Sequence, residues 1–206
     1  MIRTTPVLAA IALATTTAAY GAIDVNSSTF GGLRARSLGP AVMSGRVAAI
    51  DGVVREGEPL TLYVGTASGG VWKSDDGGIV YQPVFDDHVQ AIGAVRVDPS
   101  NPETVWVGTG ESWVRNTVAP GDGVYKSTDG GKKWKHVGLP NSDHIAELLV
   151  HPTDGNTAYV CALGHLWAPG GDRGVFRTRD GGETWENVLH LDGATSCSDL
   201  AMTPDG

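Results

Sequence analysis

Two glycine-bounded stretches combine an aromatic ring with charged side chains, the residue types best suited to gripping a ligand. Residues 110–123 read GESWVRNTVAPGDG and residues 164–174 read GHLWAPGGDRG. An indole offers a flat apolar surface, and a guanidinium can hold a carboxylate through two hydrogen bonds. In the opposite interpretation, the tryptophans are buried against their own strands and the arginines pair with local acids. Both interpretations stay open for the candidate ligand-binding residues of these loops, which are Glu111, Trp113, Arg115, Asn116, His165, Trp167 and Arg173.

The same loops limit what catalysis we expect. Inverting hydrolysis of a glycosidic bond needs two carboxyl groups roughly 6.5–9.5 Å apart. Glu111 is the acid that we expect in a suitable loop beside a tryptophan and an arginine. One acid is insufficient, so binding is favoured, glycoside hydrolysis is the alternative, and a structural part of a larger surface protein is the second alternative.

Three similar turns recur along the chain and position the loops. SDDGGIVY begins at Ser74, STDGGKKW at Ser127 and TRDGGETW at Thr178, at intervals of about 50 residues. In such a hairpin the Asp accepts backbone N–H groups, the hydroxyl bridges the turn and the glycines allow positive φ. We expect the tryptophans to fold back over the turns as plugs, and we expect scaffolding rather than catalysis. The residues concerned are Ser74, Asp76, Gly78, Ser127, Asp129, Gly131, Trp134, Thr178, Asp180, Gly182 and Trp185.

Apolar segments recur in step with these turns. GVWK, GVYK and GVFR enter them, and LYVGT, VWVGT and AYVCA lie upstream. Four antiparallel strands per unit of this length predict an all-β fold, a β-propeller that is incomplete here, with three blades plus the first strand of a fourth. The expected parts are a signal peptide (1–22), a leader (23–42), three blades (43–86, 87–139 and 140–191) and the start of a fourth blade (192–206). We expect a fragment of a longer protein, or self-association of such units.

Alignment of the units also predicts which residues line the centre. Val47, Ile92, Ile145 and Cys197 fall in register at the start of the innermost strands. Arg46 and His144 precede two of them and are candidates for ligand contact at the mouth of the central channel. Polar groups that line a wet channel are an equally good interpretation.

The two cysteines occupy repeat positions. Cys161 stands where the other units have Gly65 and Gly108, and Cys197 stands where they have a branched aliphatic residue. An exported protein can form disulfides. Because the two residues belong to different strands of different units, we favour unpaired cysteines, and a disulfide between them stays the alternative.

Charge and composition exclude several classes of partner. The formal charge of −8 and pI near 5.1 argue against nucleic acid. MIRTTPVLAAIALATTTAAYGA reads as a secretory signal, too short to span a bilayer, and it predicts a secreted or periplasmic protein. His88 and His151 lack partners at metal-ligand spacing, so no metal or cofactor is expected.

The repeat resembles the Asp-box, or bacterial neuraminidase repeat, of sialidases, xyloglucan-degrading hydrolases and the sortilin propeller. The chain also resembles a group of exported bacterial propellers described as sortilin N-terminal-like or as glycosyl hydrolases. Three segments carry this resemblance: SLGPAVMSGRVAAI, VWVGTGESWVRNTVAPGDGVYKSTDGGKKW and CALGHLWAPGGDRGVFRTRDGGETW. The resemblance to sortilin implies a peptide or glycan ligand at the loop face. The resemblance to the xyloglucan-degrading enzymes implies a catalytic Asp in the first unit, where this chain has Ala67. The fold alone does not establish hydrolysis.

Overall fold

The computed structural model describes residues 46–206, so the expected signal peptide, the leader and the first residues of the first unit lie outside the described part. Within residues 46–206 there are twelve strands and no helix. These described residues contain no helix able to cross a membrane.

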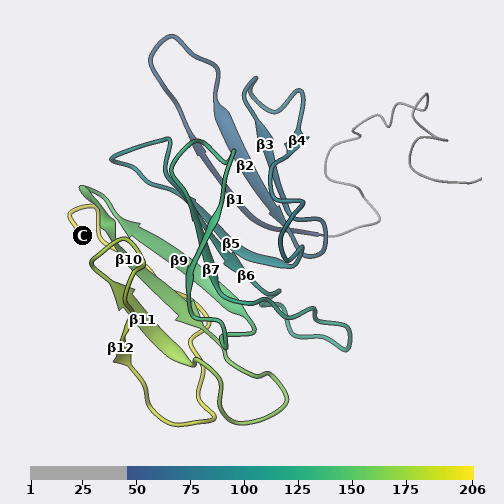
Figure 1. The fold of residues 1–206 in the computed structure, drawn as a ribbon, viewed down its shortest axis with the longest axis vertical. Helices are drawn as coiled ribbons and strands as arrows, with labels where there is room; N and C mark the ends of the chain where they lie inside the picture. The colour runs from purple at the N-terminus through teal and green to yellow at the C-terminus, as the bar shows by residue number, and fades with distance from the viewer. Residues whose placement is uncertain (1–45) are drawn as a thin grey trace, which may run out of the picture. The chain divides into compact units, whose positions relative to one another are not determined.

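The strands form three separate four-stranded antiparallel sheets (Figure 1). Each strand pairs with its neighbours in sequence, so the sheets follow one another along the chain. The first sheet contains β1 (Val47–Val53), β2 (Thr61–Thr66), β3 (Val71–Ser74) and β4 (Gln82–Pro83). The second contains β5 (Ile92–Val97), β6 (Val105–Thr109), β7 (Val124–Ser127) and β8 (Lys135–Gly138). The third contains β9 (Ile145–His151), β10 (Asp154–Ala162), β11 (Gly174–Thr178) and β12 (Glu186–Leu189).

The register of the sheets matches the alignment of the repeats. Val47, Ile92 and Ile145 each begin the first strand of a sheet, as expected. The aromatic residues of the third strands face equivalent valines of the second strands, in the pairs Val64–Trp72, Val107–Tyr125 and Val160–Phe176. The prediction of units whose four strands pair with one another is therefore confirmed.

The hydrophobic core lies between successive sheets. One buried cluster joins the first two sheets and contains Tyr63, Phe85, Ile92 and Val107. The other joins the second and third sheets and contains Trp106, Ile145, Leu148 and Phe176. A single sheet of this size cannot bury its own apolar faces, so stacking of neighbouring sheets provides most of the stability.

The three turns contain the hydrogen bonds expected from their sequences. In the second turn Ser127 Oγ donates to Asp129 Oδ1 (2.8 Å), and Ser127 Oγ accepts from the Gly131 amide (2.9 Å). Asp129 also accepts from the Lys133 amide (2.9 Å), and this bond holds the pKa of its carboxyl below the usual range. The other two turns repeat this pattern, with Ser74, Asp76 and Gly78 in the first and Thr178, Asp180 and Gly182 in the third. In all three turns the second glycine of the pair has positive φ.

The tryptophans of the turns reach further than expected. Trp134 Nε1 donates to Gly131 O of its own turn (3.1 Å) but also to Val84 O of the preceding unit (2.7 Å). Trp185 Nε1 donates to Val137 O (2.7 Å), again in the preceding unit. These rings therefore tie neighbouring sheets together instead of only covering their own turns.

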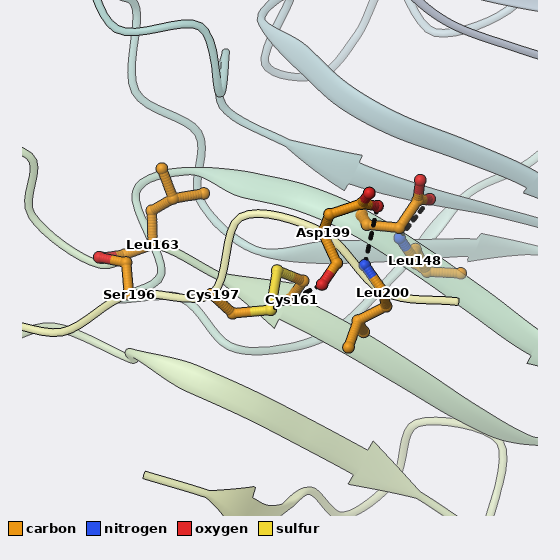
Figure 2. The surroundings of a disulfide bond; sticks show 8 residues. Leu148, Cys161, Leu163, Ser196, Cys197, Asp199 and Leu200 are labelled. Carbon is orange, nitrogen blue, oxygen red and sulfur yellow. Dashed lines mark hydrogen bonds between the residues drawn. A yellow bond between two sulfur atoms is a disulfide. The ribbon is translucent and has the colours of Figure 1, made fainter. Parts of the chain in front are cut away.

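Our expectation for the cysteines was wrong, because Cys161 and Cys197 form a disulfide with Cα atoms 5.2 Å apart (Figure 2). Cys161 lies in β10 and Cys197 in the segment after β12, and this segment passes close enough to β10 for the bond to form. Residues 192–206 form no strand in the structure. In each of the three sheets the first strand pairs with the second strand. Within the described residues no second strand lies beside residues 192–206.

Candidate functional site

The two long loops connect the second and third strands of their sheets. One runs between β6 and β7 and the other between β10 and β11, whereas the connection between β2 and β3 is short. The hairpins described above connect the third and fourth strands. Antiparallel strands alternate in direction, so these loops emerge at the end of each sheet opposite to the hairpins. We call the end that carries residues 110–123 and 163–173 the loop face.

Glu111 is the buried centre of the first long loop. Its side chain is 2% exposed and lies in ion pairs with both Arg46 and Arg115. Arg115 donates from Nε to Oε1 (3.2 Å) and from Nη2 to Oε2 (3.0 Å), which is a bidentate geometry. The carboxylate thus contacts two guanidinium groups, and this arrangement fixes both arginines at the loop face.

His144 connects this loop to the segment before β9. Its Nδ1 lies 2.8 Å from the backbone oxygen of Glu111. A carbonyl oxygen only accepts, so Nδ1 carries the hydrogen. Burial lowers the pKa of His144, with the neighbouring charge of Asp143 acting in the opposite direction. The ring is therefore neutral at pH 7 and holds the loop in place.

Asp143 joins the two long loops. Its Oδ2 lies 2.6 Å from His165 Nδ1 of the second loop, and its backbone oxygen accepts from the Gly121 amide of the first loop. Asp143 has a φ of 51°, a conformation that Asp adopts more readily than most residues. Sequence reasoning missed this residue, although its position directly before His144 was a usable signal.

Arg173 organises the second loop from within. It is buried and donates from Nη2 to the oxygens of His165 (2.6 Å) and Ala168 (3.2 Å). From Nη1 it donates to Ala194 O (3.1 Å) and to Ser196 Oγ. The guanidinium is therefore a structural part of the loop and is not presented to a ligand.

Trp113 and Trp167 are the exposed groups of the loop face. Their exposed fractions are 72% and 74%. The interpretation that the tryptophans are buried is therefore wrong. Its companion, that the arginines pair with local acids, is right for Arg115 but not for Arg173, which donates to carbonyl oxygens and a hydroxyl. Asn116 is also exposed.

Beside Trp113 there is a small cavity of about 60 Å³, whose lining includes Arg46, Ala67 and Glu111. Ala67 is buried and its amide donates to the backbone oxygen of Arg46 (3.0 Å). The side chain at the position where the resemblance implies a catalytic Asp is thus an apolar part of the cavity wall.

The remaining acids of the long loops also have partners. Asp122 accepts from the hydroxyl of Tyr125 (2.7 Å), which together with burial raises the pKa of that phenol. Asp172 accepts from the Asn141 amide (3.1 Å). Within residues 46–206 no group of His, Cys, Asp and Glu has the arrangement of a metal site. The acids of the described long loops are therefore all held by neighbouring groups.

Comparison with known proteins agrees with this architecture. No family model matches the chain. It is 30% identical over 142 residues to a probable oligoxyloglucan-reducing end-specific xyloglucanase of Neosartorya fischeri, covering 64% of this chain and 16% of that protein. It is 26% identical over 153 residues to a xyloglucanase of Paenibacillus sp, covering 66% of this chain and 14% of that protein.

Two solved structures have a similar fold. An ancestral GH74 enzyme aligns with a TM-score of 0.53 at 21% identity, over 71% of this chain and 19% of its own. The GH74 enzyme of Niastella koreensis aligns with a TM-score of 0.51 at 24% identity, over 68% and 21%. The chain spans less than a quarter of each of these proteins. The comparisons and the three sheets together show β-propeller architecture.

Proposed function

We propose that the loop face binds carbohydrate of the xyloglucan class, and that this chain is a binding part of a glycoside hydrolase-like propeller. The observation that carries the proposal is the exposure of Trp113 and Trp167, one on each long loop. A large aromatic ring left in water forgoes the stability that burial would give. Sugar rings have apolar C–H faces that an exposed indole can cover.

The loops that present these rings are well anchored. The Trp113 loop is held by Glu111 with its two arginines and by His144, and the Trp167 loop by Arg173 and by the His165–Asp143 contact. Loops fixed before the ligand arrives lose little entropy on binding. This rigidity supports a preformed platform, with Arg46, Arg115 and Asn116 at its polar edge.

The similarity to xyloglucanases favours a glycan over the peptide that the resemblance to sortilin implies. It also leaves hydrolysis as a property of the longer proteins. For this chain we propose no catalytic residue, because Glu111 is ion-paired and Ala67 carries no acid. The Asp-box identity of the three turns is part of the same proposal, supported by their shared hydrogen bonds.

We further propose that the protein acts outside the cytoplasm. The signal-like first residues support this, and so does the Cys161–Cys197 disulfide, since such bonds persist in oxidising compartments.

Isothermal titration calorimetry with xyloglucan oligosaccharides tests the binding proposal. We expect Trp113→Ala and Trp167→Ala each to weaken binding about tenfold or more, equivalent to roughly 1.4 kcal/mol. Ile79→Ala is the matched control, because Ile79 is 83% exposed but lies on a hairpin at the other end of its sheet. Equal affinity in all four proteins, or a loss in the Ile79 variant alone, would contradict the proposal.

Hydrolysis is tested separately by the release of reducing ends from a xyloglucan preparation. We expect none above background from this chain. Turnover that Glu111→Gln abolishes, in a variant that still binds the oligosaccharide, would show that Glu111 is catalytic and our assignment wrong.

A further inference from the structure

The contact between successive sheets has a repeated centre. A Cβ atom placed on Gly65 of β2 would lie 2.6 Å from Cγ2 of Ile92, the first residue of β5. A Cβ atom on Gly108 of β6 would lie 2.5 Å from Cγ2 of Ile145, the first residue of β9. In both cases the missing side chain of glycine makes room for the isoleucine of the next unit.

The disulfide occupies the third instance of this contact. Cys161 of β10 stands in the register of Gly65 and Gly108, since it pairs with Val175 as those glycines pair with Val71 and Val124. Its partner Cys197 stands in the register of the isoleucines. Figure 2 shows the two sulfur atoms joined, with Leu163 and Ser196 together on one side of the bond and Asp199 and Leu200 on the other.

The segment on the far side of the disulfide supports the Trp167 loop. Gly170 of that loop donates its amide to Gly193 O (2.9 Å). Ser196 Oγ donates to Leu163 O (2.9 Å) and accepts from Arg173. Arg173 also donates to Ala194 O (3.1 Å). Residues 193–196 thus contact the loop along much of its length and end one residue before Cys197.

We propose that the Cys161–Cys197 disulfide is a covalent form of the contact between successive units, and that it positions the Trp167 loop. The bond fixes residue 197 against β10, and residues 193–196 then lie where Gly170, Leu163 and Arg173 can bond to them. Reduction leaves this segment held by its hydrogen bonds, which also form with water. The Trp167 loop loses its fixed support when the segment moves.

The reaction that probes this bond is a simple reduction. The disulfide takes up two electrons and two protons and becomes the thiols of Cys161 and Cys197. The electrons come from an added water-soluble phosphine, which is oxidised to the phosphine oxide with oxygen from water.

Hydrogen–deuterium exchange of the full chain, read by mass spectrometry, tests the proposal. With complete reduction verified by the gain of two hydrogens, we expect amide exchange in residues 163–173 and 192–199 to become about tenfold faster or more. Exchange in the first hairpin, residues 74–81, stays unchanged. Unchanged exchange in residues 163–173 after complete reduction overturns the positioning role.

Two double variants separate the bond from the contact that it replaces. Cys161→Ser with Cys197→Ser removes both, and we expect it to exchange like the reduced protein with or without phosphine. Cys161→Gly with Cys197→Ile restores the pair found between the other units, and we expect exchange close to that of the oxidised protein in both conditions. If the Gly/Ile variant exchanges as fast as the Ser/Ser variant, the equivalence of the three contacts is wrong.

Weaker oligosaccharide binding on reduction is a consequence that also rests on the proposed function. Loss of protection without loss of affinity would leave the positioning role intact and contradict only the carbohydrate proposal for Trp167. Should a double variant fail to fold, the comparison of oxidised and reduced wild-type protein still decides the question.

Discussion

If the disulfide replaces a repeated contact, the same bond can be built between the first two units. We predict that Gly65→Cys with Ile92→Cys forms a disulfide. A Cβ atom on Gly65 lies 3.3 Å from the Cβ atom of Ile92. Bridged cysteines have Cβ atoms about 3.5–4.5 Å apart, so a shift of a few tenths of an ångström suffices.

The expected magnitude follows from the loop that the bond closes. That loop is about 27 residues long, for which the chain-entropy relation gives roughly 3.5 kcal/mol at 25 °C. Truncating the buried Ile92 costs about 1–3 kcal/mol, but this cost is the same in the oxidised and reduced forms of one variant. At about 2–4 °C per kcal/mol for a chain of this size, reduction should lower Tm by about 7–14 °C.

The assay is thermal unfolding with and without phosphine, in the Cys161→Gly/Cys197→Ile background so that the native bond does not contribute. Thiol counting shows whether the new bond forms, and Gly65→Cys alone is the control that must keep a free thiol. A double variant that is folded but still has two free thiols after equilibration in a glutathione redox buffer would refute the equivalence of the contacts.

Three further predictions concern pH and stability. Burial lowers the pKa of His144 below 6.5, so the unfolded chain binds the proton at a higher pH than the folded chain does. The free energy of unfolding should therefore fall as pH drops below about 6.5. In urea titrations at several pH values, His144→Asn should make this fall smaller. The pKa of Asp129 is lowered from 3.8, so the ionised carboxyl stabilises the fold above that pH, and this stabilisation is lost as pH falls further. The difference in free energy of unfolding between wild type and Asp129→Asn should therefore shrink between about pH 5 and pH 2. A constant difference would contradict this prediction. Trp185→Phe removes the donor to Val137 O and should lower the free energy of urea unfolding by about 1–2 kcal/mol. Trp167→Phe, at an exposed residue, should change it by less than about 0.5 kcal/mol. A larger loss in the Trp167 variant than in the Trp185 variant would contradict the burial of these two rings.

Much of the fold could be predicted because the repeat is read three times. Val47, Ile92 and Ile145 share a register, and each begins the first strand of a sheet. The glycine turns were predictable for a local reason, since the serine or threonine, the aspartate and the glycines that bond to one another are neighbours in sequence.

The state of the site residues depended on contacts between distant segments. The exposure of Trp113 follows from a loop path that Arg46 and His144 fix, and neither residue is near Trp113 in sequence. The disulfide was predictable in principle, because the register placed Cys161 at the position of Gly65 and Cys197 at the position of Ile92. What a single sequence lacked was the knowledge that those positions touch across the gap between units, as Gly65 and Ile92 do.

The exposed indoles can be tested directly by ¹⁹F NMR of the protein labelled with 5-fluorotryptophan. The chain has six tryptophans, and single Trp→Phe variants assign their resonances. On titration with xyloglucan oligosaccharides we predict that the Trp113 and Trp167 resonances shift, while those of the buried Trp106 and of Trp134 and Trp185 between the sheets do not. A titration in which no resonance moves, or in which only the tryptophans between the sheets respond, would contradict the proposed loop-face binding site.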